Sequence, residues 1–245
     1  MLRSLNGMNG YNLKALDGEI GKIVDFYFDD LSWTIQYFVV DTGGWLSGRK
    51  VLISPVANSS EPDSENKVVP LVLTREMIEK SPDIERDKPV SRQKELEMMR
   101  HYRWPVYWNE PYSGDEGAIP LEYYEQVALS EKEEGDSHLR SAREVEGYRI
   151  HATDGEIGRV KDFIVDDKTW DVRYLVVDTG DWIPGRKVII APLWLKQVKW
   201  STAEVFADLD KKSIEDSPEY DPAEPVNRDY EGRLYDYYGR PRYWK

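Results

Sequence analysis

The sequence contains one long segment twice, and this duplication limits the folds open to the chain. Residues 10–55 and 147–192 align at an offset of 137, with 26 of 46 positions identical. Leu2-Arg3-Ser4 matches Leu139-Arg140-Ser141 at the same offset, and after one deletion the match extends to Tyr107-Trp108 and Tyr243-Trp244. A repeat of about 107 residues can bury a core of its own, whereas the shorter repeats of a solenoid share one.

The segment between the two copies is acidic. Residues 109–146 hold 3 basic and 11 acidic side chains, and the whole chain has a net charge of -13. The Pro, Gly and Glu content is typical of a linker, and the acidic run at 131–136 indicates a solvated spacer rather than a docking tail. We therefore predict a first copy at residues 1–108, an acidic linker at 109–137 and a second copy at 138–245.

The first half of each copy has the pattern of short strands. Asp17-Gly18 and Asp154-Gly155 predict tight hairpin turns, because a type I′ turn needs positive φ at both central residues. Alternating apolar residues follow at Ile20, Val24, Phe26 and Phe28, and at Ile157, Val160, Phe163 and Val165. Five or six such antiparallel strands predict a small barrel, since closure leaves no unpaired edge.

The second half of each copy has the pattern of short helices. Thr74 and Asp210 are suitable N-caps for helices of one to two turns. Ser91 and Asn227 predict a second helix, at 92–103 in the first copy and at about 228–238 in the second. An aromatic arm follows, which we expect to dock on a barrel. The predicted fold class is mainly β with α additions: two small antiparallel β-barrels, each followed by short C-terminal helices.

Taken together, DGEIGKIVDF, the Asp pair before Trp33, YFVVDTG, GRKVLISP and the terminal PVYW resemble the PRC-barrel family, and the pattern recurs in the second copy. The resemblance implies the compact barrel of the photosynthetic reaction-centre H subunit and of the C-terminus of the 16S ribosome maturation factor, where it contacts other proteins. This chain lacks the transmembrane helix of the first and the RNA-associated domain of the second. It most resembles free-standing bacterial members with two barrels.

Composition narrows the function classes. The negative charge argues against nucleic acid as a partner, because it would repel the phosphate backbone. The absence of Cys excludes disulfides and cysteine zinc sites, and no run of about 18 apolar residues occurs. We therefore expect a soluble, cytoplasmic chain without a transmembrane segment.

No catalytic or cofactor motif stands out. His101, His138 and His151 lie in different contexts, and none recurs in the other copy. The sequence contains neither an HExxH motif nor a glycine loop for phosphate. We predict that the chain is not an enzyme and that it has no cofactor or metal site. The paired acids Asp29-Asp30 and Asp166-Asp167 indicate turns rather than a cation site, because they lack the ligand spacing of an EF-hand.

Two sets of duplicated residues remain as site candidates. Asp25 and Asp162 lie in apolar strands, where a carboxylate must be paired; they are either satisfied by neighbouring donors, which we favour, or proton-active. The Trp-x-x-Gly-Arg-Lys loops are either a contact surface rich in hot-spot residues or ordinary hairpins whose Trp covers the barrel end, the interpretation we favour. The candidate contact residues are Trp45, Arg49, Lys50, Trp182, Arg186 and Lys187.

The main functional hypothesis is a non-enzymatic protein-interaction or assembly module. It would bind another protein or itself, since two similar surfaces can pack about a pseudo-two-fold axis, as in a homodimer. The alternatives are a peripheral component of a photosynthetic or electron-transfer complex, which only the family resemblance suggests, and a small-ligand or cation-binding protein.

Overall fold

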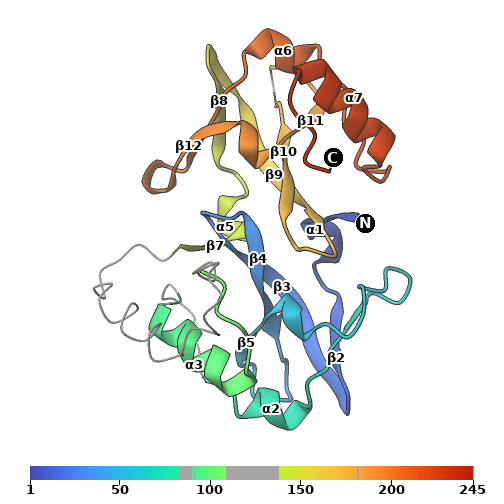
Figure 1. Cartoon of the computed structure of the whole chain (residues 1–245), viewed down its shortest axis with the longest axis vertical. Helices are drawn as coiled ribbons and strands as arrows, with labels where there is room; N and C mark the ends of the chain where they lie inside the picture. Colours follow the sequence, from blue (N-terminus) through green and yellow to red (C-terminus); the bar gives the residue numbers. More distant parts are fainter. Residues whose placement is uncertain (83–89, 91, 109–137, 181, 245) are drawn as a thin grey trace, which may run out of the picture. The chain divides into compact units, whose positions relative to one another are not determined.

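The strands of this chain form two sheets (Figure 1). The computed structural model describes residues 1–82, 90, 92–108, 138–180 and 182–244. The six-stranded sheet has the order β5-β4-β3-β2-β6, with β7 paired to β3, and the seven-stranded sheet has the order β11-β10-β9-β8-β13-β12, with β1 paired to β9. The predicted fold class, mainly β with short helices, is confirmed.

The elements of the first copy are β1 (Leu2–Ser4), α1 (Leu5–Met8), β2 (Asn12–Ala15), β3 (Gly18–Asp29), β4 (Thr34–Asp41), β5 (Lys50–Ile53), η1 (Pro55–Ala57), β6 (Val68–Pro70), α2 (Arg75–Glu79) and α3 (Arg92–Tyr102). Those of the second copy are β7 (Leu139–Ser141), α5 (Ala142–Val145), β8 (Arg149–Ala152), β9 (Gly155–Asp166), β10 (Val172–Asp178), β11 (Lys187–Ile190), η2 (Pro192–Trp194), β12 (Leu195–Lys199), η3 (Trp200–Thr202), β13 (Glu204–Ala207), α6 (Lys211–Glu215) and α7 (Arg228–Tyr238).

Strand pairing follows the predicted hairpins with one departure. The Asp-Gly turns join β2 to β3 and β8 to β9 as antiparallel pairs. The pairs β2–β6 and β8–β13 are parallel instead, with Leu13 opposite Val69 and Ile150 opposite Val205. Among the described strands the two ends of each sheet do not pair with each other, so neither sheet closes on itself there.

The compact units of the structure do not coincide with the sequence copies. Unit 1 comprises Met1–Asn9, Asp25–Gln36 and Arg140–Lys245, and unit 2 comprises Gly10–Val24 and Tyr37–Leu139. Unit 1 therefore contains two segments of the first copy. The predicted linker at 109–137 lies outside the described residues.

Three of the four predicted N-cap residues form capping hydrogen bonds. Thr74 accepts a hydrogen bond from the Met77 N–H, Asp210 from the Ser213 N–H and Asn227 from the Tyr230 N–H. Ser91 lies outside the described residues. Figure 1 shows α6 and α7 beside the strands of the second sheet.

A buried glutamate anchors each aromatic arm to its sheet. In unit 2 the Glu95 carboxylate accepts hydrogen bonds from the hydroxyls of Tyr37, on β4, and Tyr107, on the arm, at 3.2 and 2.7 Å. In unit 1 the Glu231 carboxylate accepts the corresponding bonds from Tyr174 and Tyr243, at 2.7 and 2.8 Å. The expected docking of each arm thus occurs against a strand tyrosine of its own copy, Tyr37 or Tyr174, through a polar cluster as well as ring packing.

The second glycine of each DGEIG motif is required by a close backbone approach. A Cβ atom at Gly158 would lie 2.0 Å from the Asp178 carbonyl oxygen, and one at Gly21 would lie 2.1 Å from that of Asp41. We expect Gly158→Ala to lower the free energy of unfolding by about 2 kcal/mol or more in urea denaturation.

Gly180 provides the matched control for this substitution. It also has a positive φ, of 54°, but a Cβ there would meet no atom within 4 Å. Gly180→Ala should therefore cost only the left-handed backbone strain, about 1 kcal/mol. Equal losses in the two variants would contradict the steric argument.

Candidate functional site

The Leu-Arg-Ser segment of each copy pairs with the long strand of the other copy. β1 runs antiparallel to β9, with Leu2 opposite Asp166 and Ser4 opposite Ile164. β7 pairs with β3. Figure 1 shows α1, which follows β1, beside the strand β9. The two segments are therefore reciprocally exchanged, and we call the region where they bind the exchange junction.

The duplicated aspartates bind the exchanged segments. The Asp162 carboxylate accepts hydrogen bonds from the Ser4 hydroxyl at 2.5 Å and from the Asn6 N–H at 3.0 Å. It also accepts one from the Phe163 N–H, its neighbour on β9, at 2.7 Å. Ser4 in turn accepts a bond from the Gly7 N–H and so caps α1. The aspartate thus holds the segment at the start of its helix.

Asp25 repeats this arrangement on β3. Its carboxylate accepts hydrogen bonds from the Ser141 hydroxyl at 2.6 Å, the Arg143 N–H at 3.1 Å and the Phe26 N–H at 2.8 Å. Burial raises the pKa of Asp25 and of Asp162, and the serine and backbone donors lower each pKa only in part. The structure therefore places both candidate acids among donors that satisfy them, most of which belong to the other copy.

The second acid of each Asp-Asp pair binds the arginine of the exchanged segment. The Asp167 carboxylate lies 2.5 Å from Arg3 Nε, and the Asp30 carboxylate lies 2.8 Å from Arg140 Nε. The Asp167 side chain is 0% exposed, and it also accepts a hydrogen bond from the Met1 amino group. A buried carboxylate needs such a partner, since an unpaired buried charge is strongly destabilising.

The first acid of each pair has a different role. The Asp29 carboxylate accepts hydrogen bonds from the N–H groups of Leu31 and Ser32, and the Asp166 carboxylate accepts one from the Lys168 N–H. These short-range bonds form the turns that the sequence indicates. The carboxylate of the second acid binds the arginine of the other copy.

The two copies also bond to each other where their turns end. The Ile35 N–H donates to the Trp170 carbonyl at 2.8 Å, and the Val172 N–H donates to the Trp33 carbonyl at 2.7 Å. Both tryptophans have positive φ, 55° and 61°. Beside this crossing, the rings of Phe28 and Phe163 lie 5.7 Å apart and are 0% exposed. The exchange junction therefore has an apolar, aromatic interior with polar bonds around it.

The residues of the Trp-Gly-Arg-Lys loops lie outside the exchange junction. Arg49 donates to the carbonyls of Ser81 and Pro82, at 2.5 and 3.0 Å, and Arg186 donates to that of Ser217. Each arginine thus fixes the chain just after α2 or α6. The rings of Trp45 and Trp182 are half-buried, with the Arg75 guanidinium 4.4 Å and the Lys211 ammonium 5.0 Å from their respective centroids. Lys50 and Lys187 begin β5 and β11.

The histidines are not brought together. His101 lies against the Met77 carbonyl at 2.6 Å, and His151 stacks on Phe206 with the ring centroids 4.9 Å apart. His138 directly precedes β7. Within the described residues, no group of three or more His, Asp or Glu side chains is arranged to hold a metal ion.

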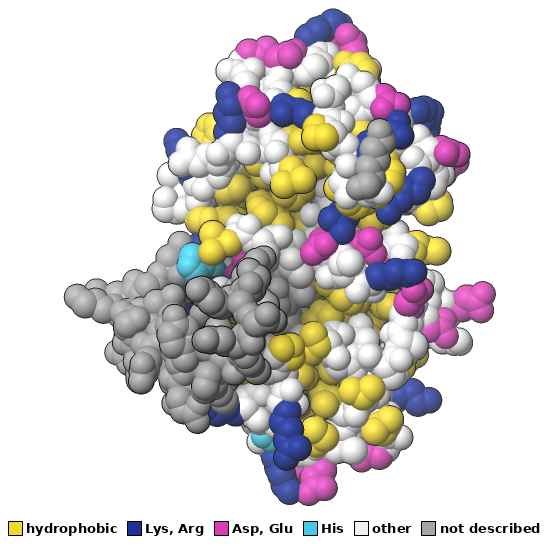
Figure 2. Space-filling model, viewed as in Figure 1, with side chains coloured by type: hydrophobic (Ala, Val, Ile, Leu, Met, Phe, Trp, Pro, Cys, Tyr) yellow, Lys and Arg dark blue, Asp and Glu magenta, His cyan; other side chains and the backbone are white. Residues whose placement is uncertain are grey.

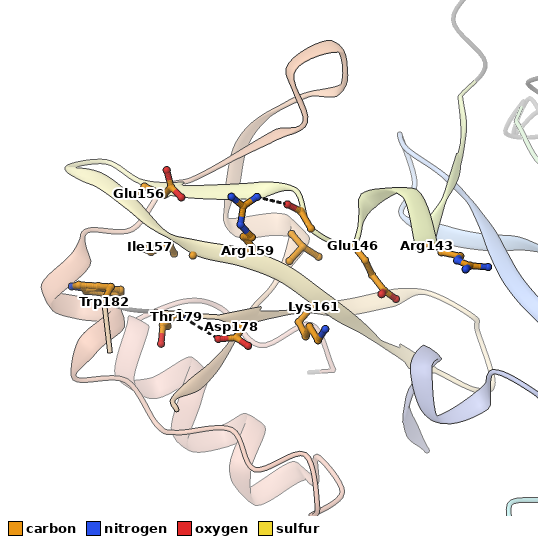
Figure 3. Close-up of a pocket in the computed structure, with 13 residues that line it drawn as sticks. Arg143, Glu146, Glu156, Ile157, Arg159, Lys161, Asp178, Thr179 and Trp182 are labelled. Atoms are coloured by element: carbon orange, nitrogen blue, oxygen red, sulfur yellow. Dashed lines mark hydrogen bonds between the residues drawn. The ribbon is translucent and has the colours of Figure 1, made fainter. Parts of the chain in front are cut away.

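Unit 1 also contains a groove of about 860 Å³ that is lined in part by residues of β9 (Figure 3). Gly147, Gly158 and Gly180 leave part of its wall without side chains. Trp182 lies at one end of the row of labelled side chains and Arg143 at the other, with Arg159 and Lys161 between them. Its acidic members are Glu146, Glu156 and Asp178. The volume falls in the range of small-molecule sites, and the lining offers both signs of charge.

Exposed hydrophobic side chains do not by themselves define a site. Figure 2 shows hydrophobic side chains at the surface, interspersed with Lys, Arg, Asp and Glu. Leu193, Leu31 and Leu16 are among the most exposed of the described residues. Single exposed apolar residues are normal on a protein surface, so the candidate sites of this chain are the exchange junction and the groove.

Sequence reasoning missed the exchange itself and both buried glutamates. A signal for contact between these residues was present, although not for the exchange, because Leu-Arg-Ser and the acids Asp25, Asp30, Asp162 and Asp167 all repeat. Pairing the repeated arginines with the repeated acids would have suggested an ionic contact. The signal for Glu95 was weaker, since it lies in the polar run RQKE.

The comparison with protein families supports one assignment. The PRC-barrel domain model matches residues 4–72 and 138–200, which together are just over half of the chain. The comparison with curated proteins gives no match. Among the described residues, every helix is too short or too polar to cross a membrane.

Proposed function

Because this chain belongs to the PRC-barrel family, we propose that it acts as a non-enzymatic protein-interaction or assembly module. The observation that carries the proposal is the exchange junction. There the duplicated acids Asp25, Asp30, Asp162 and Asp167 bind a chain segment rather than face an open cavity.

The chemistry of these acids favours recognition over catalysis. A general acid or base must reach a substrate proton at hydrogen-bond distance. The oxygens of Asp25 and Asp162 are instead occupied by serine hydroxyls and backbone N–H groups. Main-chain hydrogen bonds and strand pairing are one of the recurring ways in which a protein recognises a peptide segment.

The experiment is lysine crosslinking and affinity capture of the full chain from its native cells. Under this proposal a defined protein partner, or a second copy, is crosslinked to the chain at stoichiometric levels. Crosslinks at Lys50 and Lys187 would assign the contact to the Trp-Gly-Arg-Lys loops. Crosslinks only at other lysines would show that these loops are not the contact surface. A strictly monomeric chain that captures no protein would count against the proposal.

The groove favours a second candidate, a small-ligand-binding protein. Arg143 and Lys161 line the groove, and the first copy has Asn6 and Val24 at the corresponding positions. These two positively charged side chains therefore occur only in the second copy. A screen of metals and metabolites should then contain a ligand that raises the melting temperature. Arg143→Asn and Lys161→Val should reduce that shift, whereas a flat screen would remove this candidate.

A further inference from the structure

The exchange junction contains two complete seats for a Leu-Arg-Ser segment. We use "seat" for Asp162, Asp167 and the β9 backbone that pairs with β1, and for their counterparts Asp25, Asp30 and β3. In each seat the strand aspartate binds the serine and the turn aspartate binds the arginine. The same recognition occurs twice, with different flanking residues, so it depends on the arginine and serine rather than on one local context.

The side-chain contacts between the segment and the first seat join residues that are far apart in the chain. Ser4 and Asp162 are separated by 158 positions, and Arg3 and Asp167 by 164. The segment is followed by Gly10, whose φ of 82° marks a bend before β2, and β2 belongs to unit 2. Local sequence therefore does not dictate which seat a segment occupies.

Contacts that join distant parts of one chain form equally well between two chains when identical elements are exchanged. The two arrangements differ mainly in effective concentration, which is in the millimolar range for a short connection. A chain with both parts intact therefore uses its own segment. A chain whose seat is empty offers the same bonds to another chain.

We infer that the Leu-Arg-Ser segment and its seat are a transferable recognition pair, so that the empty seat of one chain binds the segment of a second copy. This inference rests on the proposed function and names the partner: a second copy of this chain, recognised through one buried arginine–carboxylate pair, one serine–carboxylate bond and strand pairing.

Charge reversal gives a direct test in the full-length protein. Arg3→Asp places a carboxylate against Asp167, and Asp167→Arg places a guanidinium against Arg3, so each variant loses its own pairing by like-charge repulsion. When the two variants are mixed, Arg3 of one meets Asp167 of the other, and the two substituted residues also form an opposite-charge pair. We expect a 1:1 heterodimer by light scattering, at least about tenfold tighter than either variant with itself.

The double variant Arg3→Asp/Asp167→Arg in one chain is the matched control. It restores an opposite-charge pair within the chain and should be folded and monomeric. Lys80→Glu, at an exposed pair with Glu76, controls for a charge reversal away from the seat and should not dimerise with either variant. If the single variants are poorly folded alone, recovery of a folded heterodimer on mixing would still support the inference.

Failure of the mixed variants to associate, with the double variant folded, would overturn the inference. It would leave the proposed function standing if the wild-type chain still captured a partner through other residues. If instead the wild-type chain captured no partner while the two variants formed a heterodimer, the proposed function as an interaction module would fail. The recognition of the Leu-Arg-Ser segment by its seat would still be supported. The two results are therefore distinguishable.

Discussion

Substituting Phe28 with alanine is expected to lower the free energy of unfolding of unit 1 by about 3–5 kcal/mol, although Phe28 belongs to the first sequence copy. Its ring is 0% exposed and lies 5.7 Å from the Phe163 ring and 6.4 Å from the Trp200 ring, both in the second copy. Hydrogen exchange should then accelerate most in β9 and β10, which are more than 100 positions away in the sequence.

The matched control is Leu13→Ala in unit 2. Leu13 is also 0% exposed, and it lies on β2 opposite Val69 of β6. This substitution removes buried methyl groups at a cost of about 2–5 kcal/mol, and its effect on exchange should be strongest in β2 and β6. If Phe28→Ala accelerated exchange only within residues 10–82, the interleaved composition of unit 1 would be wrong.

The local features of the fold were predictable because short stretches of sequence determine them. An Asp-Gly pair between apolar runs specifies a hairpin through its own backbone preferences, and the β2–β3 and β8–β9 pairs follow. A capping side chain needs only the N–H two or three residues later, which is why Thr74, Asp210 and Asn227 were found.

The exchange was not predictable from the same patterns. The two Leu-Arg-Ser segments are identical, and so are the acids that bind them, so periodicity does not distinguish pairing with one strand from pairing with the other. The choice depends on chain geometry over more than 100 residues. Sequence analysis correctly noted that an aspartate in an apolar strand needs donors, but the donors are Ser4 and Ser141 from the opposite copy.

The buried glutamates were missed for a related reason. Glu95 follows Arg92, Gln93 and Lys94, and a charged run of this kind normally marks a solvated helix face. Its burial depends on Tyr37, which is 58 positions earlier, and on Tyr107, which comes after the helix has ended. A charged residue can occupy a core position only when such distant partners are supplied.

Glu95 is expected to make the stability of the protein fall as the pH rises from about 4.5 to about 7. Burial raises the pKa of Glu95 to about 7, although Arg92 and the hydroxyls of Tyr107 and Tyr37 oppose the shift. The ordinary pKa of a glutamate, which describes the unfolded chain, is 4.5. Between these values the folded state holds a proton that the unfolded state has lost, so deprotonation favours unfolding.

The size of this effect follows from the difference between the two pKa values. At 1.36 kcal/mol per unit, the contribution of Glu95 to the free energy of unfolding should decrease by about 3 kcal/mol across this pH range. The contribution is fully present below pH 4.5 and absent above pH 7. Burial also raises the pKa values of Asp25 and Asp162, so these groups also make the free energy of unfolding fall with rising pH. A variant that changes Glu95 alone is therefore needed.

Glu95→Gln isolates it by removing the titrating group while keeping an acceptor for the two tyrosine hydroxyls. The variant loses the bond from Arg92, which keeps its contact with the Tyr107 hydroxyl at 2.9 Å. Urea denaturation at several pH values should show that wild type loses stability between pH 4.5 and 7 more steeply than the variant.

Glu97→Gln, on the same helix and 53% exposed, makes the same chemical change at the surface and should keep the wild-type slope. An unchanged slope in Glu95→Gln would mean that the Glu95 carboxylate is ionised throughout this range. The arm carrying Tyr107 would then be held by a permanent charge pair with Arg92, and docking of the arm would be independent of pH.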